Sequence, residues 1–214
     1  MRVHVVCGYR SKSDGWTEKW TDADFRARNL VKALKRETFN GFSEWQVTAT
    51  KQTLRVDNTP AGQTMALRLA LSKLFDLFAK AGIEEARVVP VPSSKTVAPG
   101  DGSTGSRLVT AIAGIKPTML ACPVLFFNEP QPKTADSGSR RWQDILPHLR
   151  GKVPAGGGPI ILLDDVMTSG GHLRACARFF AERGESVNDA FVVGRTVWER
   201  PESMFQMPVE TLSL

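Results

Sequence analysis

The stretch Ile160-Ile-Leu-Leu-Asp-Asp-Val-Met-Thr-Ser-Gly-Gly-His172 governs the interpretation of this sequence. Its first four residues are apolar and predict a buried strand, which delivers two adjacent carboxylates, Asp164 and Asp165, to its end. The hydroxyl and glycine residues at 168–171 then turn the chain into a helix. Glycine lets backbone N–H groups approach an oxyanion closely, and the N-terminus of a helix adds a favourable dipole. The stretch therefore predicts an anion-binding loop close to a pair of acids.

The two acids would repel an anion in that loop, so they require a different partner on the same ligand. Hydroxyl groups or a metal ion would satisfy them. A sugar phosphate meets both demands, with its phosphate in the loop and its ribose hydroxyls on Asp164 and Asp165. Paired acids after an apolar strand also occur in receiver domains and in phosphatases of the haloacid-dehalogenase type, but those sites do not need the Thr-Ser-Gly-Gly that follows here. The sequence contains no GxxxxGK[ST] motif, so a P-loop nucleotidase is not predicted.

Working outward from this stretch, short apolar runs alternate with segments of helical periodicity. Helix starts are predicted at Thr21 and at Thr59-Pro60, where a capping hydroxyl precedes the apolar pattern. Strands are predicted over 3–6, 87–91, 119–127 (interrupted by Pro123), 160–163 and 190–193, and further helices over 106–113 and 171–183. This alternation predicts an α/β fold, in which a parallel sheet carries helices on both faces and binds ligands at the carboxyl ends of its strands.

Composition narrows the class of protein. The 214 residues suit one domain, 42% of them are hydrophobic, and the net charge of +6 favours an anionic partner such as nucleic acid or a phosphorylated small molecule. Apolar residues never run for the roughly 18 positions of a membrane span, and the first ten residues do not resemble a secretory signal. Cys7, Cys122 and Cys176 lie far apart, which predicts neither a zinc site nor a disulfide framework. We expect a cytoplasmic protein with no membrane partner.

The segment from Leu162 to Gly171 resembles the phosphoribosyl-pyrophosphate-binding motif of the type I phosphoribosyltransferases. That motif has apolar residues, two acids, two variable positions and a loop rich in hydroxyl groups and glycine before a helix. The resemblance implies that Asp164 and Asp165 bind the 2′- and 3′-hydroxyls of ribose. It also implies that the 5′-phosphate binds to Thr168, Ser169, Gly170, Gly171 and His172. His172 departs from the family, which often has threonine at that position.

The resemblance extends more weakly over residues 86–197. Val89-Pro-Val-Pro-Ser-Ser-Lys95 is similar to the strand and pyrophosphate loop of the family, particularly of its competence-associated branch, and implies that pyrophosphate binds to Ser93, Ser94 and Lys95. A second basic segment falls where the family has its flexible catalytic loop. With Lys95, its cations would stabilise the leaving group: Lys133, Arg140 and Arg141.

Residues 1–85 resemble no family that we recognise, and residues 86–214 would form the phosphoribosyltransferase core and its C-terminal tail. In the family, an N-terminal or C-terminal portion forms a small hood over the base. We therefore expect residues 1–85 to pack on the core or to form that hood.

The resemblance implies Mg²⁺-dependent transfer of phosphoribosyl from phosphoribosyl pyrophosphate to a nitrogenous base, with release of pyrophosphate. Mg²⁺ would be held mainly by the donor, with Asp164 and Asp165 as further ligands. The alternative is a non-catalytic protein that binds phosphoribosyl pyrophosphate and serves regulation or DNA uptake, in which case nucleic acid becomes a partner. A phosphatase or another sugar-phosphate enzyme that uses the same acids is a third reading. The acceptor base is not identified by the sequence, and a homodimer stays open.

Overall fold

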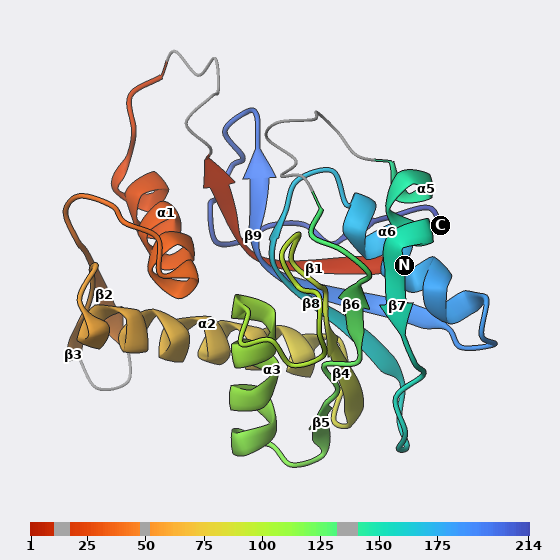
Figure 1. Cartoon of the computed structure of the whole chain (residues 1–214). Helices are drawn as coiled ribbons and strands as arrows, with labels where there is room; N and C mark the ends of the chain where they lie inside the picture. The colour runs from red at the N-terminus through yellow and green to blue at the C-terminus, as the bar shows by residue number, and fades with distance from the viewer. Residues whose placement is uncertain (11–17, 48–51, 132–140) are drawn as a thin grey trace.

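A central sheet of six strands organises the computed structural model, which describes residues 1–10, 18–47, 52–131 and 141–214 (Figure 1). The strands follow the order β10-β1-β9-β8-β4-β5. All neighbours in this sheet are parallel except β10, which runs antiparallel to β1. Their bounds are β10 (Glu210–Thr211), β1 (Arg2–Arg10), β9 (Val187–Val197), β8 (Ile160–Met167), β4 (Ala86–Pro90) and β5 (Met119–Ala121). The predicted α/β class with a mostly parallel sheet is confirmed.

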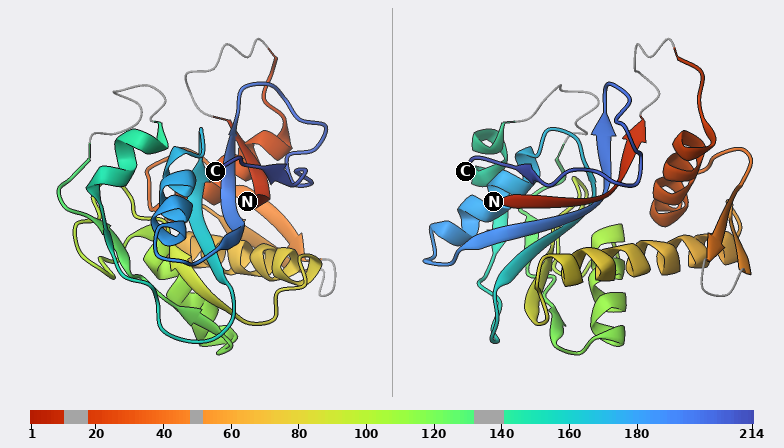
Figure 2. Two further views of the ribbon diagram at one scale, coloured as in Figure 1. Left: turned by 90° about the vertical axis from the view of Figure 1, so that its right-hand side faces the viewer. Right: turned by 180° about the vertical axis from the view of Figure 1, so that it is seen from behind.

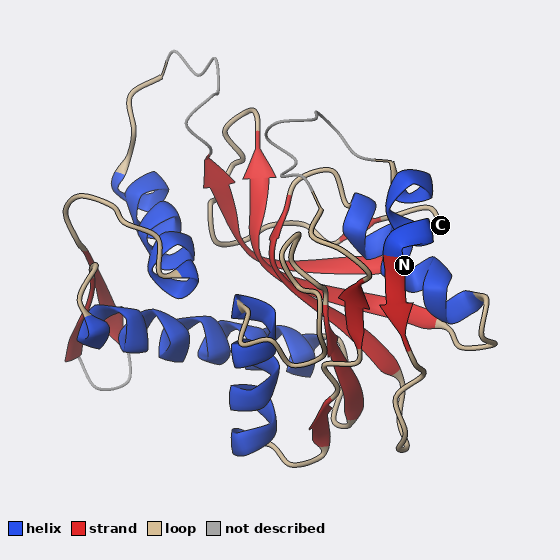
Figure 3. Cartoon of the chain, in the orientation of Figure 1, coloured by secondary structure: helices blue, strands red, loops and turns tan. Residues whose placement is uncertain are grey.

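Helices cover both faces of the sheet, as predicted (Figure 3). On one face, Phe78 packs edge-on against Phe191 of the sheet, with ring centroids 4.5 Å apart. On the other face, Phe180 is buried in a cluster that includes Leu162. The first face carries α1 (Asp22–Lys35), α2 (Pro60–Lys80) and α3 (Thr104–Ile115), and the second carries α5 (Trp142–Ile145), a short 3₁₀ helix (Leu146–His148) and α6 (Gly171–Ala181).

Two helix N-termini form as their sequences predict. Thr21 and Asp24 make a capping box at the start of α1, in which each side chain accepts a hydrogen bond from the backbone of the other residue. At the start of α2, the hydroxyl of Thr59 accepts the N–H of Gly62, and Pro60 occupies a first-turn position that needs no donor. Local chemistry alone therefore fixes where these helices begin.

The apolar run at 119–127 does not form one strand. Pro123 interrupts it, so that β5 joins the main sheet while β6 (Leu125–Phe127) pairs antiparallel with β7 (Leu149–Gly151). Proline has no N–H to donate to a sheet, which explains why the chain changes partners there. A second small sheet, β2 (Ser43–Val47) with β3 (Gln52–Val56), lies beside one end of α2 (Figure 1).

The strand predicted over 160–163 continues to Met167, because β8 pairs with β9 as far as Met167 opposite Arg195. Asp164 and Asp165 therefore lie within the strand rather than after it, and Asp164 is opposite Val192.

The N-terminal strand β1 lies between β9 and β10, so the first residues of the chain pair with its last strands (Figure 2). Residues 18–85 then place α1 and α2 on one face before the chain returns to the sheet at β4. Whether residues 1–85 act as a family-specific unit stays a prediction. Within the described ranges, no helix is long and apolar enough to cross a membrane.

Candidate functional site

The predicted anion-binding loop connects β8 to α6 and borders a pocket of about 60 Å³. Gly170 adopts a φ of 76°, a left-handed conformation that favours glycine. A side chain at Gly170 would also come within 2.8 Å of Leu212. The structure thus brings Asp164 together with every residue predicted to bind the 5′-phosphate. The pocket is lined by Asp164, Val166, Met167, Thr168, Ser169, Gly170, Gly171, His172 and Leu173.

The carboxyl groups of Asp164 and Asp165 form a closely coupled pair. An oxygen of Asp164 accepts the backbone N–H of Asp165 at 2.8 Å, and the two side chains hydrogen-bond to each other. Burial raises the pKa of Asp164 well above its ordinary value, and the charge of Asp165 raises it further, although the Asp165 N–H and the charge of Lys35 act in the opposite direction. The pair is therefore suited to accept hydrogen bonds or to meet a cation.

Lys35 and Arg107, from two helices, lie near Asp165, with Arg36 close to Arg107, and our sequence analysis did not assign these cations to the site. Lys35 lies at the end of α1, where burial lowers its pKa but a hydrogen bond with Glu37 and the charge of Asp165 raise it overall. Arg107 of α3 donates to the carbonyl of Leu34 at 2.8 Å. Burial lowers the pKa of Arg107, as does the nearby charge of Arg36, whereas Asp165 opposes both effects.

Arg36 is the residue of this cluster that the sequence could have singled out, because an arginine there replaces the glycine that commonly ends a helix. It follows α1 at the position where glycine is common, and its φ of 58° is the only positive value among the described non-glycine residues. Strained backbone of this kind concentrates at functional sites.

The predicted pyrophosphate loop begins beside the acid pair. β4 ends opposite Leu163, and the N–H of Val91 donates to the Leu163 carbonyl at 2.8 Å. Residues 93–95 therefore follow the end of β4 on the same side of the sheet as the residues after Leu163. Thr96 closes the turn, because its hydroxyl accepts the N–H of Ser93 at 3.1 Å. The backbone N–H of Gln131 donates to the carbonyl of Ser94 at 2.7 Å, while Lys95 is exposed.

The other predicted residues are placed as follows. His172 lines the pocket and lies edge-on to Phe127, with ring centroids 6.0 Å apart. Arg141 is exposed beside a hollow of about 460 Å³ that also borders Ser169 and Arg174. Lys133 and Arg140 lie outside the described residues, so the catalytic role of the basic loop stays a prediction.

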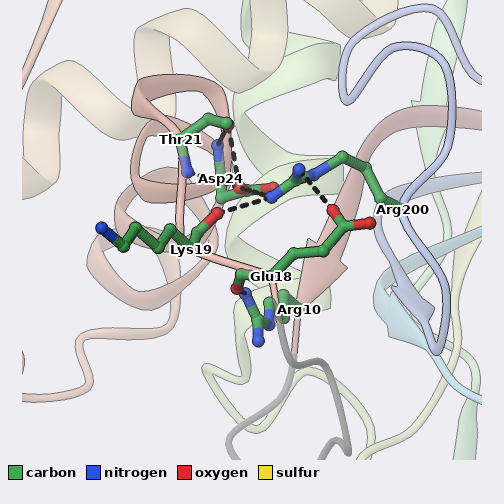
Figure 4. Close-up of polar contacts among 6 residues, drawn as sticks. All are labelled: Arg10, Glu18, Lys19, Thr21, Asp24 and Arg200. Atoms are coloured by element: carbon green, nitrogen blue, oxygen red, sulfur yellow. Dashed lines mark hydrogen bonds and ion pairs between the residues drawn. The ribbon is translucent and has the colours of Figure 1, made fainter.

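A polar network fastens the chain after β9 to the start of α1 (Figure 4). Arg200 donates to the carboxylate of Asp24 at 3.2 Å and to the carbonyl of Lys19 at 2.7 Å, and it pairs with Glu18 at 2.5 Å. The same oxygen of Asp24 accepts the N–H and hydroxyl of Thr21. This network holds α1, and with it Lys35 and Arg36 at its far end, against the sheet.

Comparison with known proteins gives little beyond the fold. No model of a known protein family matches the chain, and no curated protein matches it. Among solved structures, the crystal structure of orotate phosphoribosyltransferase from Aeropyrum pernix is similar, with a TM-score of 0.37 and 16% sequence identity. The similarity covers 78% of this chain and 81% of that chain. Because the TM-score is low, the inferences that follow depend on the residues of the site and not on this likeness.

Proposed function

We propose that this protein transfers phosphoribosyl from phosphoribosyl pyrophosphate to a nitrogenous base. One observation carries the proposal: a glycine-containing loop at the start of α6 shares a pocket with Asp164, whose partner acid is Asp165. A helix N-terminus favours a phosphate, whereas a carboxylate pair favours hydroxyl groups. A ribose phosphate carries both groups a few bonds apart.

The reaction breaks the bond between the anomeric carbon and a pyrophosphate oxygen, while a base nitrogen forms a bond to that carbon. Positive charge develops on the sugar, where the carboxylates of Asp164 and Asp165 would stabilise it as they hold the ribose hydroxyls. Negative charge develops on the departing pyrophosphate. Lys95, the two cations near Asp165 (Lys35 and Arg107) and Arg36, which lies near Arg107, would stabilise that charge.

The two carboxylates fit a Mg²⁺ ion that binds together with phosphoribosyl pyrophosphate. Magnesium is usually bound through one or two carboxylates together with substrate phosphates and water. The acid pair supplies such carboxylates, and the described part of the chain holds no cluster of three or more His, Cys, Asp or Glu side chains that could bind a metal alone. Bound with the donor, Mg²⁺ would neutralise charge on the pyrophosphate, while Asp164 and Asp165 orient the ribose.

Calorimetric titration with phosphoribosyl pyrophosphate and Mg²⁺ tests the proposal. Asp164→Asn and Asp165→Asn each replace a charge-assisted hydrogen bond by a neutral one, a loss of about 1 kcal/mol or roughly five- to tenfold in affinity. Asp76→Asn, an exposed acid on α2, is the matched control and should bind as the wild type does. Unchanged affinity in both site variants would contradict the assignment of the acids to ribose.

Pyrophosphate release with a panel of bases then separates an enzyme from a binding protein. Release with at least one base supports transfer. Tight binding of the donor without release for any base, together with salt-dependent binding of DNA, would favour the non-catalytic alternative instead.

A further inference from the structure

Two arginines hold the carbonyl groups of the anion-binding loop from outside the pocket. Arg195 of β9 donates through Nη1 to the carbonyl of Thr168 at 2.5 Å. Arg174 of α6 donates through Nη1 to the carbonyl of Ser169 at 2.9 Å. Consecutive carbonyls of one short loop are thus each bound by a guanidinium group.

Because of peptide geometry, a hydrogen bond to a carbonyl also fixes the direction of the N–H group of the next residue. A trans peptide is planar, and its C=O and N–H point in opposite directions. Fixing the carbonyl of Thr168 therefore fixes the direction of the Ser169 N–H, and fixing the carbonyl of Ser169 does the same for Gly170. Both residues line the pocket that also contains Asp164.

A segment near the end of the sequence, residues 210–214, holds both arginines in turn. Glu210 pairs with Nε of Arg195 at 2.8 Å, and the carbonyl of Ser213 accepts Nε of Arg174 at 3.0 Å. Between these contacts, Leu212 lies against Gly170, and its N–H donates to the carbonyl of Met1 at 2.9 Å. The segment is anchored to β1 and so provides a fixed support behind the loop.

We propose that Arg174 and Arg195 are positioning residues that aim the N–H groups of Ser169 and Gly170 at the phosphate of the ligand, with residues 210–214 as their support. The proposal rests on the proposed function, because it takes the loop as the site of the 5′-phosphate. It adds residues outside the motif, on which the affinity of the loop depends: Arg174, just after it, and Arg195 and residues 210–214, far from it in sequence.

Titration of the intact protein with ribose 5-phosphate measures the effect. Arg174→Met and Arg195→Met should each weaken binding about tenfold, because one N–H donor loses its direction. Arg183→Met is the matched control: Arg183 follows the C-terminal end of α6 and donates to a helix carbonyl, that of Phe179, at the opposite end of the helix from the loop. Its affinity should stay within twofold of the wild type.

Charge and geometry are separated by salt and by a conservative variant. Screening at about 1 M salt reduces a purely electrostatic contribution at exposed groups, so a loss of affinity that disappears at high salt would overturn the positioning role. Arg195→Lys keeps the charge and one donor for the Thr168 carbonyl, but a lysine cannot contact both Thr168 and Glu210 as the planar guanidinium does. It should therefore recover only part of the affinity. Glu210→Gln should have a smaller effect than Arg195→Met, in the same direction.

The amide resonances of Ser169 and Gly170 in the unliganded protein give a readout that does not need a ligand. Arg195→Met should shift the Ser169 amide and Arg174→Met the Gly170 amide, whereas Arg183→Met should shift neither. Unmoved amides would overturn the positioning role. If the wild type binds no ribose 5-phosphate but these shifts occur, the proposed function fails and the control of the loop by the arginines stands.

Discussion

At the amino end of the sheet, Asp189 of β9 accepts hydrogen bonds from His4 at 2.7 Å and from Arg2 at 2.8 Å. Farther toward the carboxyl end, Asp164 of β8 meets a second acid and accepts one neighbouring backbone N–H. Burial alone would raise the pKa of Asp189, but its two hydrogen-bonding partners lower the pKa overall. Burial and a like charge instead raise the pKa of Asp164.

The same side chain therefore has opposite consequences for stability at the two positions. Asp189 is paired within the protein and stabilises the sheet as an anion. Asp164 is destabilised as an anion, which is the condition of a group whose partner comes from a ligand. The difference agrees with the binding site that we propose at the carboxyl end of the sheet.

The largest effect is expected from removing the paired acid. Asp189→Ala leaves the buried His4 and the Arg2 guanidinium without their acceptor, so the free energy of unfolding should fall by about 3 kcal/mol. For a chain of this length that corresponds to a fall in Tm of roughly 6–12 °C. Because the pKa of Asp189 is lowered in the folded state, its contribution is present above the unfolded pKa and is lost as the pH falls.

Thermal unfolding of the wild type and the variant, followed from about pH 3 to about pH 7, measures this loss. The control is Asp76→Ala, which removes a surface pair with Lys73 that is worth about 0–1 kcal/mol. Equal losses for the two variants would show that Asp189 is no more important than a surface acid.

A third carboxylate, Asp24, shows whether stability depends on the hydrogen-bonding partners of an acid or on the end of the sheet at which it lies. Asp24 is fully buried, near the carboxyl edge, and is bonded by Thr21 and Arg200. Arg200→Met should lower the free energy of unfolding by about 1–2 kcal/mol, since Thr21 still satisfies one oxygen. Chemical denaturation would measure the loss. Arg26→Met on the same helix, which removes only the exposed pair with Asp22, should cost about 0.3–0.5 kcal/mol. A stabilised Arg200 variant would break the rule that paired acids stabilise.

Asp164 should give the opposite sign. Asp164→Asn removes a charge that burial and the neighbouring Asp165 disfavour. We expect the variant to be more stable than the wild type at neutral pH, while it binds the donor less well. Because the pKa of Asp164 is raised in the folded state, its contribution is present at low pH and is lost as the pH rises.

The advantage of Asp164→Asn should therefore grow with pH, opposite to the trend for Asp189. Differential scanning calorimetry of both variants across one pH series tests this contrast. A lower Tm for Asp164→Asn at neutral pH would show that the acid is structural.

The smallest effect is expected at the strained cation. Arg36→Gly relieves the left-handed backbone after α1 and should stabilise the protein by about 0.5–1 kcal/mol. It should also reduce affinity for pyrophosphate, because it removes a cation from the proposed site. Arg36→Lys keeps both the strain and the charge, and should change neither quantity by much. A stabilised glycine variant with unchanged pyrophosphate affinity would remove Arg36 from the candidate site.

The sequence predicted those features that depend on neighbouring residues. Thr21 and Thr59 began helices as expected, because a hydroxyl caps nearby backbone N–H groups in any context. The apolar run at 160–163 gave a buried strand for a similar local reason. Pro123 correctly indicated an interruption, but which strand β6 would then join depends on β7, more than twenty residues away.

The remainder depends on contacts between distant segments. The acids at 164 and 165 resembled the end of a strand, yet pairing with β9 extends β8 past them. Lys35 and Arg36 looked like ordinary helix-terminal cations, and only the packing of α1 against the sheet brings Lys35 near Asp165. The support behind the anion loop was also not predicted, because the two residues of β10 carry no pattern of their own.

The position of β1 sets the order in which this protein can be assembled as it is made. Arg2 pairs with Asp189, a separation of 187 residues, so the second residue emerges from the ribosome long before its neighbour. At roughly 5–20 residues per second, translation leaves β1 waiting about 10–40 s for β9. During that time the valines of β1 cannot be buried between neighbouring strands. No contacts are yet available to offset the entropy lost in closing so long a loop. The anion loop is likewise synthesised before Arg195 and Glu210 can brace it. The yield of folded protein should therefore depend more on translation speed and chaperone access than on the stability of the folded state.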